Sequence, residues 1–291
     1  MLGYVCKYTP MELFEAMDTE ITRLEPSVTD FNHADTLMHA NICSYTKAVL
    51  EDVMEHDYEG VILTTCCDSI RRLYDTLKSQ FPDKFFFLLD IPRKFNDFAV
   101  TLYERQLKQM LTEYEAFSGK TLDLKRFVPM MQNKAALKKQ ENTRMSASAA
   151  SEKGNGQKLN IGIMGARCNN EIRQLLVDRG ANLLFDLTCT GLARDFSITE
   201  DQVLHSYAAA LLNQIPCMRM LKAANREHFL DGFTDRLDGI IYHTVKFCDS
   251  YSYEYADFRQ RLDLPILLVE TDSTRPVSYT HLRAHETDQY L

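Results

Sequence analysis

The sequence predicts an α/β protein built from two doubly wound domains, each with a parallel sheet. Short apolar runs alternate with amphipathic helical segments along the 291 residues, which is the pattern of parallel-sheet domains. The length exceeds the usual ~100–200 residues of one domain. A run rich in Ser, Ala and Gly, SASAASEKGNGQ at 146–157, is typical of a flexible linker and divides the chain.

The elements of the first half are predicted from hydrophobic periodicity and from residues that start or stop helices. Apolar runs predict strands at residues 3–6, 61–65 and 85–91. Helical spacing of apolar residues predicts helices at 45–55, from Asp68 onward, through 103–117 and at 122–144. We therefore expect a first α/β domain at 1–118, followed by a helical segment and linker at 119–157.

The same pattern restarts after the linker and predicts a second α/β domain at 158–276. Strands are expected at 159–166, 182–188, 239–243 and 265–270. Helices are expected at 169–179, 200–213, 218–231 and 250–261. An internal echo supports two similar halves, since GVILTTCCDSIRRLYD (60–75) resembles GIIYHTVKFCDSYSYEYAD (239–257), and a strand follows each.

Residues 277–291 are predicted to be a non-native tail. VSYTHLRAHET (277–287) has no core pattern and resembles the translation of a sequencing-library adapter. We therefore expect the natural protein to be truncated near Pro276. His281 and His285 have the i, i+4 spacing of a helical metal pair, but we exclude them from the site for this reason.

Composition and charge argue against nucleic-acid binding, membrane insertion and secretion. A net charge of −8 without a basic patch argues against nucleic-acid binding. No apolar stretch approaches the ~18 residues of a membrane span, and the start MLGYVCKYTPMELF lacks the features of a signal peptide. We expect a cytoplasmic protein without a membrane partner, in which eight cysteines serve as thiols or metal ligands rather than as disulfides.

Most of the cysteines fall where an apolar run ends and a helical pattern begins, and none forms a CxxC pair. These junction cysteines are Cys6, Cys66, Cys67, Cys168, Cys189 and Cys248. Because the carboxyl ends of parallel strands share one edge of a sheet, residues far apart in sequence are expected to converge there. Thiolate-rich chemistry at that edge favours an iron–sulfur cluster.

The start of a helix favours a thiolate, because free N–H groups and the helix dipole stabilise negative charge. Cys66, Cys67 and Cys248 precede Asp-Ser pairs that we expect to cap helices, and Cys43 opens the helix in NICSYTKAVLEDV. The candidate set extends to the cysteines at 189, 217 and 6. GARCNNEI, around Cys168, also reads as a plain strand-to-helix turn.

Other interpretations of the same residues remain open. Each cysteine could be a small buried hydrophobe. Structural zinc sites usually draw on two close pairs of ligands, which dispersed cysteines match poorly. A nucleophilic cysteine with His243 as base is a further alternative. His243 and Lys246 flank the predicted cluster site and are our candidate catalytic residues, for proton transfer or for holding an anion.

Two nucleotide motifs are absent or incomplete. The chain has no GxxxxGKS/T loop, so we do not expect it to hydrolyse ATP itself. GIMGAR at 162–167 does not complete the GxGxxG pattern of a dinucleotide site.

Six sequence blocks together resemble one known family. They are GYVCKYTPMELFEA, NICSYTKAVLEDV, TTCCDSIRRLYD, DLTCTG, YHTVKFCDSYSYEYA and LPILLVETD. They are similar to the 2-hydroxyacyl-CoA dehydratase component D superfamily, which includes benzoyl-CoA reductase subunits and double-cubane cluster proteins. The resemblance extends over residues 3–272.

This resemblance implies two Rossmann-like domains with a four-iron four-sulfur cluster (4Fe-4S) between them. By motif, its ligands match Cys43, one of Cys66 or Cys67, and Cys248; Cys67 is favoured because it directly precedes the aspartate. Cys189 and Cys217 match additional cysteines of relatives that carry a double-cubane cluster (8Fe-9S). Those two blocks and the doubled Cys66–Cys67 favour that branch.

The activity implied by the resemblance is radical reduction in an anaerobic cytoplasm. A separate ATP-dependent iron–sulfur activator would supply a low-potential electron, and a homologous subunit would complete a homo- or heterodimer. The substrate would be a 2-hydroxyacyl-CoA for a dehydratase of the lyase class, or a small molecule for a double-cubane reductase. A non-catalytic electron-transfer or scaffold subunit is the remaining alternative.

Overall fold

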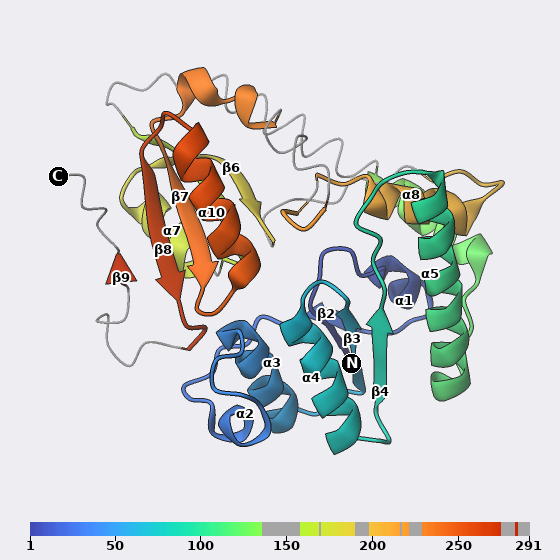
Figure 1. Ribbon diagram of the computed structural model, residues 1–291. Coiled ribbons are helices and arrows are strands. Elements are labelled where there is room, and N and C mark those ends of the chain that lie inside the picture. Colours follow the sequence, from blue (N-terminus) through green and yellow to red (C-terminus); the bar gives the residue numbers. More distant parts are fainter. Residues whose placement is uncertain are drawn as a thin grey trace.

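The computed structural model describes residues 1–135, 158–168, 170–189, 198–215, 217–220, 229–274 and 283–284. In these ranges the strands form two sheets, with the orders β2-β1-β3-β4 and β6-β5-β7-β8-β9 (Figure 1). The predicted linker at 146–157 lies outside the described residues, as do the middle of the predicted helix 218–231 and all of the tail except residues 283–284. None of the described helices has the length and apolarity needed to cross a membrane.

The first sheet consists, in the described part of the chain, of four parallel strands. They are β1 (Leu2–Tyr4), β2 (Ile21–Arg23), β3 (Gly60–Thr64) and β4 (Phe85–Leu89). The helices of this half are α1 (Met11–Ala16), α2 (Asn32–Leu37), α3 (Ser44–Glu55), α4 (Asp68–Gln80) and α5 (Asp97–Ser118). Residues 124–135 are also helical, within the predicted helical segment.

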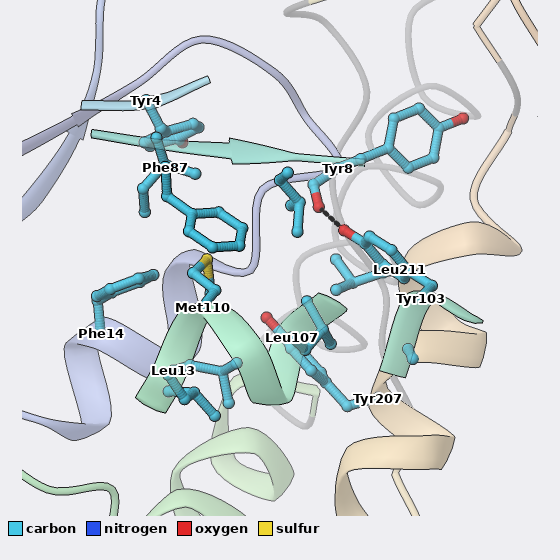
Figure 2. Packing of buried hydrophobic residues seen from close by; sticks show 14 of the residues in the cluster. Tyr4, Tyr8, Leu13, Phe14, Phe87, Tyr103, Leu107, Met110, Tyr207 and Leu211 are labelled. Carbon is cyan, nitrogen blue, oxygen red and sulfur yellow. Dashed lines mark hydrogen bonds between the residues drawn. The ribbon is translucent and has the colours of Figure 1, made fainter. Parts of the chain in front are cut away.

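Helices cover both faces of this sheet. Side chains alternate between the faces of a strand, and in β3 Val61 and Leu63 join a core formed with α3 and α4, whereas Ile62 joins a core formed with α1 and α5. Figure 2 shows the second of these cores, in which the Tyr103 hydroxyl donates a hydrogen bond to the Tyr8 carbonyl oxygen over 2.5 Å. The predicted doubly wound α/β fold is confirmed for this half.

The second sheet repeats this arrangement. Its parallel strands are β5 (Asn160–Gly165), β6 (Asn182–Thr188), β7 (Gly239–Val245) and β8 (Ile266–Thr271), and the short β9 (Arg283–Ala284) pairs antiparallel with β8. Its helices are α7 (Asn170–Asp178), α10 (Asp249–Arg261) and the 3-10 turn η1 (Thr234–Arg236). One face of the sheet packs on α10 in a core that includes Tyr242 and Phe258.

One helix of the second half of the sequence packs on the first half. The helix α8 (Val203–Leu212) lies beside α5 in Figure 1, and its residues Tyr207 and Leu211 belong to the core of the first sheet. The buried Tyr207 hydroxyl donates to Glu12 over 2.5 Å, and His205 contacts Glu104 over 2.8 Å. The two halves are therefore joined by a shared core as well as by the chain.

Besides the 3-10 turn η1 and the two-residue strand β9 of the second half, the sequence prediction missed three short elements of the first half: α1, β2 and α2. The helices have six residues each and the strand has three. Such lengths are below the window of about 11–18 residues over which hydrophobic periodicity is measured. The longer elements were all predicted from their periodicity.

The strand order places a crevice at one edge of each sheet. The chain moves from β1 to β2 on one side and then to β3 on the other side of β1, and it does the same around β5 with β6 and β7. Such a reversal opens a crevice at the carboxyl ends of the two central strands. These ends lie between β1 and β3 in the first sheet and between β5 and β7 in the second.

Gly165 allows the close approach of strands at the second crevice. Its φ is +106°, and a Cβ atom built there would lie 2.1 Å from the carbonyl oxygen of His243. Gly180 also has a positive φ, of +75°, but its Cβ would meet nothing within 4 Å. We expect Gly180→Ala to cost about 1 kcal/mol of unfolding free energy and Gly165→Ala about 2 kcal/mol more, because only the latter adds a clash with backbone. Urea unfolding of the two variants measures this difference, and equal costs would contradict the packing argument.

Candidate cysteine site

Three helices begin directly after a cysteine. Cys43 is the N-cap of α3, Cys67 of α4 and Cys248 of α10. In each helix the backbone N–H three residues beyond the cysteine faces the sulfur and favours its thiolate, although none of these contacts is a formed capping hydrogen bond. Cys67 and Cys248 also occupy equivalent places, since each lies three residues beyond the end of its strand.

The sequence prediction placed these two caps one residue too late. Asp68 and Asp249 were expected as N-caps, but each is the first residue inside its helix. An acidic residue there still favours the helix through the dipole. The correction makes the sulfur, rather than the carboxylate, the group that faces the free N–H groups.

A pair of cysteines joins the two halves of the protein. The side chains of Cys43 and Cys248 share a hydrogen bond, which with the nearby N–H groups lowers the pKa of Cys43 to about 7 despite its burial. The same hydrogen bond and burial raise the pKa of Cys248. Next to this pair, the backbone N–H of Ser44 donates to the carbonyl oxygen of Lys246 over 3.1 Å. The start of α3 and the end of β7 are thus held against each other.

A second group of thiols lies at the crevice of the first sheet. Cys6 follows β1, and its side chain is hydrogen-bonded to that of Cys66, which follows β3. This bond favours the thiolate of Cys66, but a hydrogen bond to Cys67 and burial outweigh it and raise the pKa of Cys66. The bond from Cys66 is also the main cause of the lowered pKa of Cys67. The three thiols therefore form a continuous chain that ends at the N-terminus of α4.

Cys189 and Cys217 lie near both groups. Cys189 follows β6; burial raises its pKa to about 11, with smaller electrostatic contributions from Cys217 and Cys6. The charge of Cys189 in turn contributes to the raised pKa of Cys248, and the charge of Cys43 opposes the lowering of the pKa of Cys67. Tyr8 is buried among these thiols, and its hydroxyl accepts a hydrogen bond from the Cys217 N–H over 3.3 Å.

Hydrogen bonds or electrostatic interactions thus link all seven cysteines of the predicted set. The eighth, Cys168, has a pKa raised to about 12, mainly by burial, and its charged neighbours are Arg173 and Asp186. Its sequence context, a plain strand-to-helix turn, had left it outside the set.

Two arginines of the second half reach across to the first half. Arg167 donates to the carbonyl oxygens of Leu24, over 2.9 Å, and of Val5, and its guanidinium lies 4.3 Å from the ring centre of Tyr45. Arg219 donates to the Thr65 carbonyl oxygen over 3.2 Å. Both place positive charge near thiols, and the charge of Arg219 contributes to the lowered pKa of Cys67.

Sequence reasoning missed these arginines and the role of Tyr8. Each lies within two residues of a cysteine in the sequence, which is the one signal that could have identified them. Tyr251 is buried in the core of the second half, and its hydroxyl lies 2.6 Å from the Cys189 sulfur.

His243 and Lys246 occupy different environments. His243 is 2% exposed, and its Nε2 contacts the Thr271 hydroxyl over 3.0 Å. Burial lowers the pKa of His243 to about 4, and its charged neighbours are Arg173 and Asp186. Lys246 is exposed at the end of β7, with its amino group 5.4 Å from the ring centre of Phe247. Arg173 and Asp186 are the charged neighbours of both His243 and Cys168, and Cys168 is outside the predicted ligand set. The catalytic role of His243 therefore stays a prediction.

The donor geometry separates two kinds of metal site. Among the described residues, no three His, Cys, Asp or Glu side chains converge closely enough to hold one metal ion. A single zinc ion needs its donors around one point, whereas the iron atoms of a cluster are bound by separate thiolates. A set of cysteines spread along the meeting edges of two sheets is compatible with the second requirement.

The comparison with known proteins covers almost the entire chain. A family model described as 2-hydroxyglutaryl-CoA dehydratase, D-component, matches residues 6–151 and 129–283. No curated protein matches the chain. The two matched segments include all seven cysteines of the predicted set. With a family match of this extent and a two-sheet α/β fold, this protein belongs to the 2-hydroxyglutaryl-CoA dehydratase D-component family.

Proposed function

We propose that this protein is an iron–sulfur component of the 2-hydroxyacyl-CoA dehydratase type, which passes a low-potential electron from an ATP-dependent activator to a bound substrate. The observation that carries the proposal is the Cys43–Cys248 contact, which links a helix start of each half. Membership of the D-component family supports a dehydratase-type role.

In this proposal Cys43, Cys67 and Cys248 hold a four-iron four-sulfur cluster. Such a cluster supplies a one-electron centre whose potential depends on charge, hydrogen bonds and solvent exposure. The chain contributes three helix N-termini that favour thiolates. It also places the charges of Arg167 and Arg219 nearby, and Cys43 is buried while Cys67 and Cys248 are partly buried.

A double-cubane centre is a second candidate, favoured by a specific observation. Cys189, Cys217 and Cys6 are electrostatic neighbours, and they meet around Tyr8 beside the first three cysteines. Additional thiolates could hold a second cubane. In that case the protein would reduce a small molecule instead of dehydrating an acyl-CoA thioester.

Partners follow from the family and from the exposed edge of the site. We propose an activator with its own iron–sulfur centre and a homologous subunit, because D-components imply both. The exposed Lys246 amino group is the candidate to hold an anionic part of the substrate or to supply a proton from its Nζ. His243, whose Nε2 lies 3.0 Å from the Thr271 hydroxyl, is the second proton-transfer candidate.

Iron and acid-labile sulfide counts test the proposal. After anaerobic reconstitution we expect about four iron atoms per chain for one cubane, or about eight for a double cubane. Replacing Cys189 and Cys217 together by serine should halve the iron of a double cubane and leave a single cubane unchanged. A reconstituted wild-type chain without iron would refute both candidates.

Turnover separates an enzyme from an electron-transfer or scaffold subunit. With activator, ATP and a reductant, a dehydratase should convert a 2-hydroxyacyl-CoA to the enoyl-CoA, alone or with its homologous subunit. Cluster reduction without turnover of acyl-CoA or of small molecules would favour the scaffold role.

A further inference from the structure

We infer that Tyr251 tunes the reduction potential of the metal centre by donating its phenolic hydrogen to the sulfur of Cys189. This inference rests on the double-cubane form of the proposed function, in which Cys189 is a cluster ligand, and it assigns a role to a residue outside the cysteine set. The tyrosine acts through a thiolate and is therefore a tuning residue, not a catalytic one.

The position of Tyr251 makes it a link between two strand ends. It lies in the first turn of α10, three residues beyond Cys248, and is 5% exposed. Its hydroxyl oxygen lies 2.6 Å from the Cys189 sulfur, and Cys189 directly follows β6. Its backbone N–H faces the sulfur of Cys248, which follows β7. One residue thus presents a donor to each of two thiols from different strands.

The direction of the hydrogen bond follows from the chemistry of a ligand. A cysteine that binds iron is a thiolate without a proton, so the phenolic O–H must be the donor. Hydrogen bonds in a water-poor interior are electrostatically stronger than those in water. The hydrogen bond from Tyr251 therefore stabilises negative charge on the Cys189 sulfur.

That effect changes with the oxidation state of the centre. Reduction adds negative charge to the cluster and its sulfur ligands. A donor aimed at a ligand sulfur stabilises the reduced state more than the oxidised state, and hydrogen bonds to the sulfurs are among the factors that set the potential. Tyr251 should therefore raise the potential, and its removal should lower it.

The test is Tyr251→Phe, which removes one oxygen and keeps the ring. We expect the reconstituted variant to keep its iron and to be harder to reduce, with the equilibrium constant for reduction about tenfold smaller, which equals about 59 mV for one electron. Tyr253→Phe is the matched control, because Tyr253 lies on the same helix and is 77% exposed. It should leave the potential unchanged.

The outcomes separate this inference from the proposed function. Wild-type protein without iron would overturn the proposed function and the role of Tyr251 with it. About four iron atoms per chain, unchanged in Cys189→Ser, would leave the single-cubane proposal standing and overturn the role of Tyr251. Full iron and an unchanged potential in Tyr251→Phe would overturn the role of Tyr251 alone. If Tyr251→Phe loses iron, the test is 3,5-difluorotyrosine at position 251, which is a stronger hydrogen-bond donor of nearly the same shape. It should raise the reduction potential of the centre, and an unchanged potential would refute the inference.

Discussion

Alanine in place of Cys43 should leave this protein folded and unable to retain its iron. Cys43 is the ligand candidate that connects the halves, since its thiol is hydrogen-bonded to Cys248 and acts electrostatically on Cys67. It is also the sulfur at the start of α3, and its pKa of about 7 makes the thiolate accessible at neutral pH. Losing one of three ligands from a cubane should remove nearly all of the bound iron.

Cys168→Ala is the matched control for this substitution. Both cysteines are buried, at 8% and 2% exposed, but Cys168 lies outside the predicted ligand set, and its charged neighbours are Arg173 and Asp186. Each alanine should cost about 1 kcal/mol of unfolding free energy, and only Cys43→Ala should lose iron. Iron content by colorimetric assay and circular dichroism of both variants measure the two effects. Full iron in Cys43→Ala would remove this residue from the ligand set.

The sequence predicted the candidate site because the site is built from local patterns. A buried strand, a cysteine and the start of an amphipathic helix occur at 60–80 and again at 239–261, and the two segments form β3–α4 and β7–α10. In parallel sheets the carboxyl ends of strands share an edge, so convergence within each half follows from the pattern. Cys67 and Cys248 could be predicted in this way.

What local patterns do not encode is how the halves meet. Arg167 finds its carbonyl partners in residues 5 and 24, which are more than a hundred positions away. In the same way α8 packs on α5 rather than on the second sheet, because its apolar residues complete the core around Tyr103. Apolar periodicity predicts that one face of a helix is buried, but it does not identify the sheet or helix against which that face packs.

The orientation of His243 is a further example. Successive side chains of a strand point to opposite faces, and Tyr242 lies in the core formed with α10. His243 therefore faces the opposite side of the sheet, where Arg173 and Asp186 act on it. Proximity to Cys248 in the sequence suggested a place in the cysteine site, but strand alternation turns this side chain towards other residues.

Burial of His243 should make the stability of the second half depend on pH. Its folded-state pKa is about 4, lowered mainly by burial, against an unfolded value of about 6.5. Between these values the unfolded chain binds more protons at this site, so acid favours unfolding. The contribution is complete above pH 6.5 and is lost as the pH falls towards 4; the total is about 3 kcal/mol.

His243→Gln isolates this contribution, since glutamine keeps a polar group beside Thr271 and does not titrate. Urea unfolding at pH 7, 6, 5 and 4.5 should show that the variant loses less unfolding free energy on acidification than the wild type, with the gap growing below pH 6.5. His39→Gln, at an exposed histidine of the first half, is the control for the loss of a histidine as such. If the unfolding free energies of His243→Gln and of the wild type fall in parallel with pH, burial does not lower the pKa of this imidazole in the folded protein. The pH dependence assigned to His243 would then be wrong.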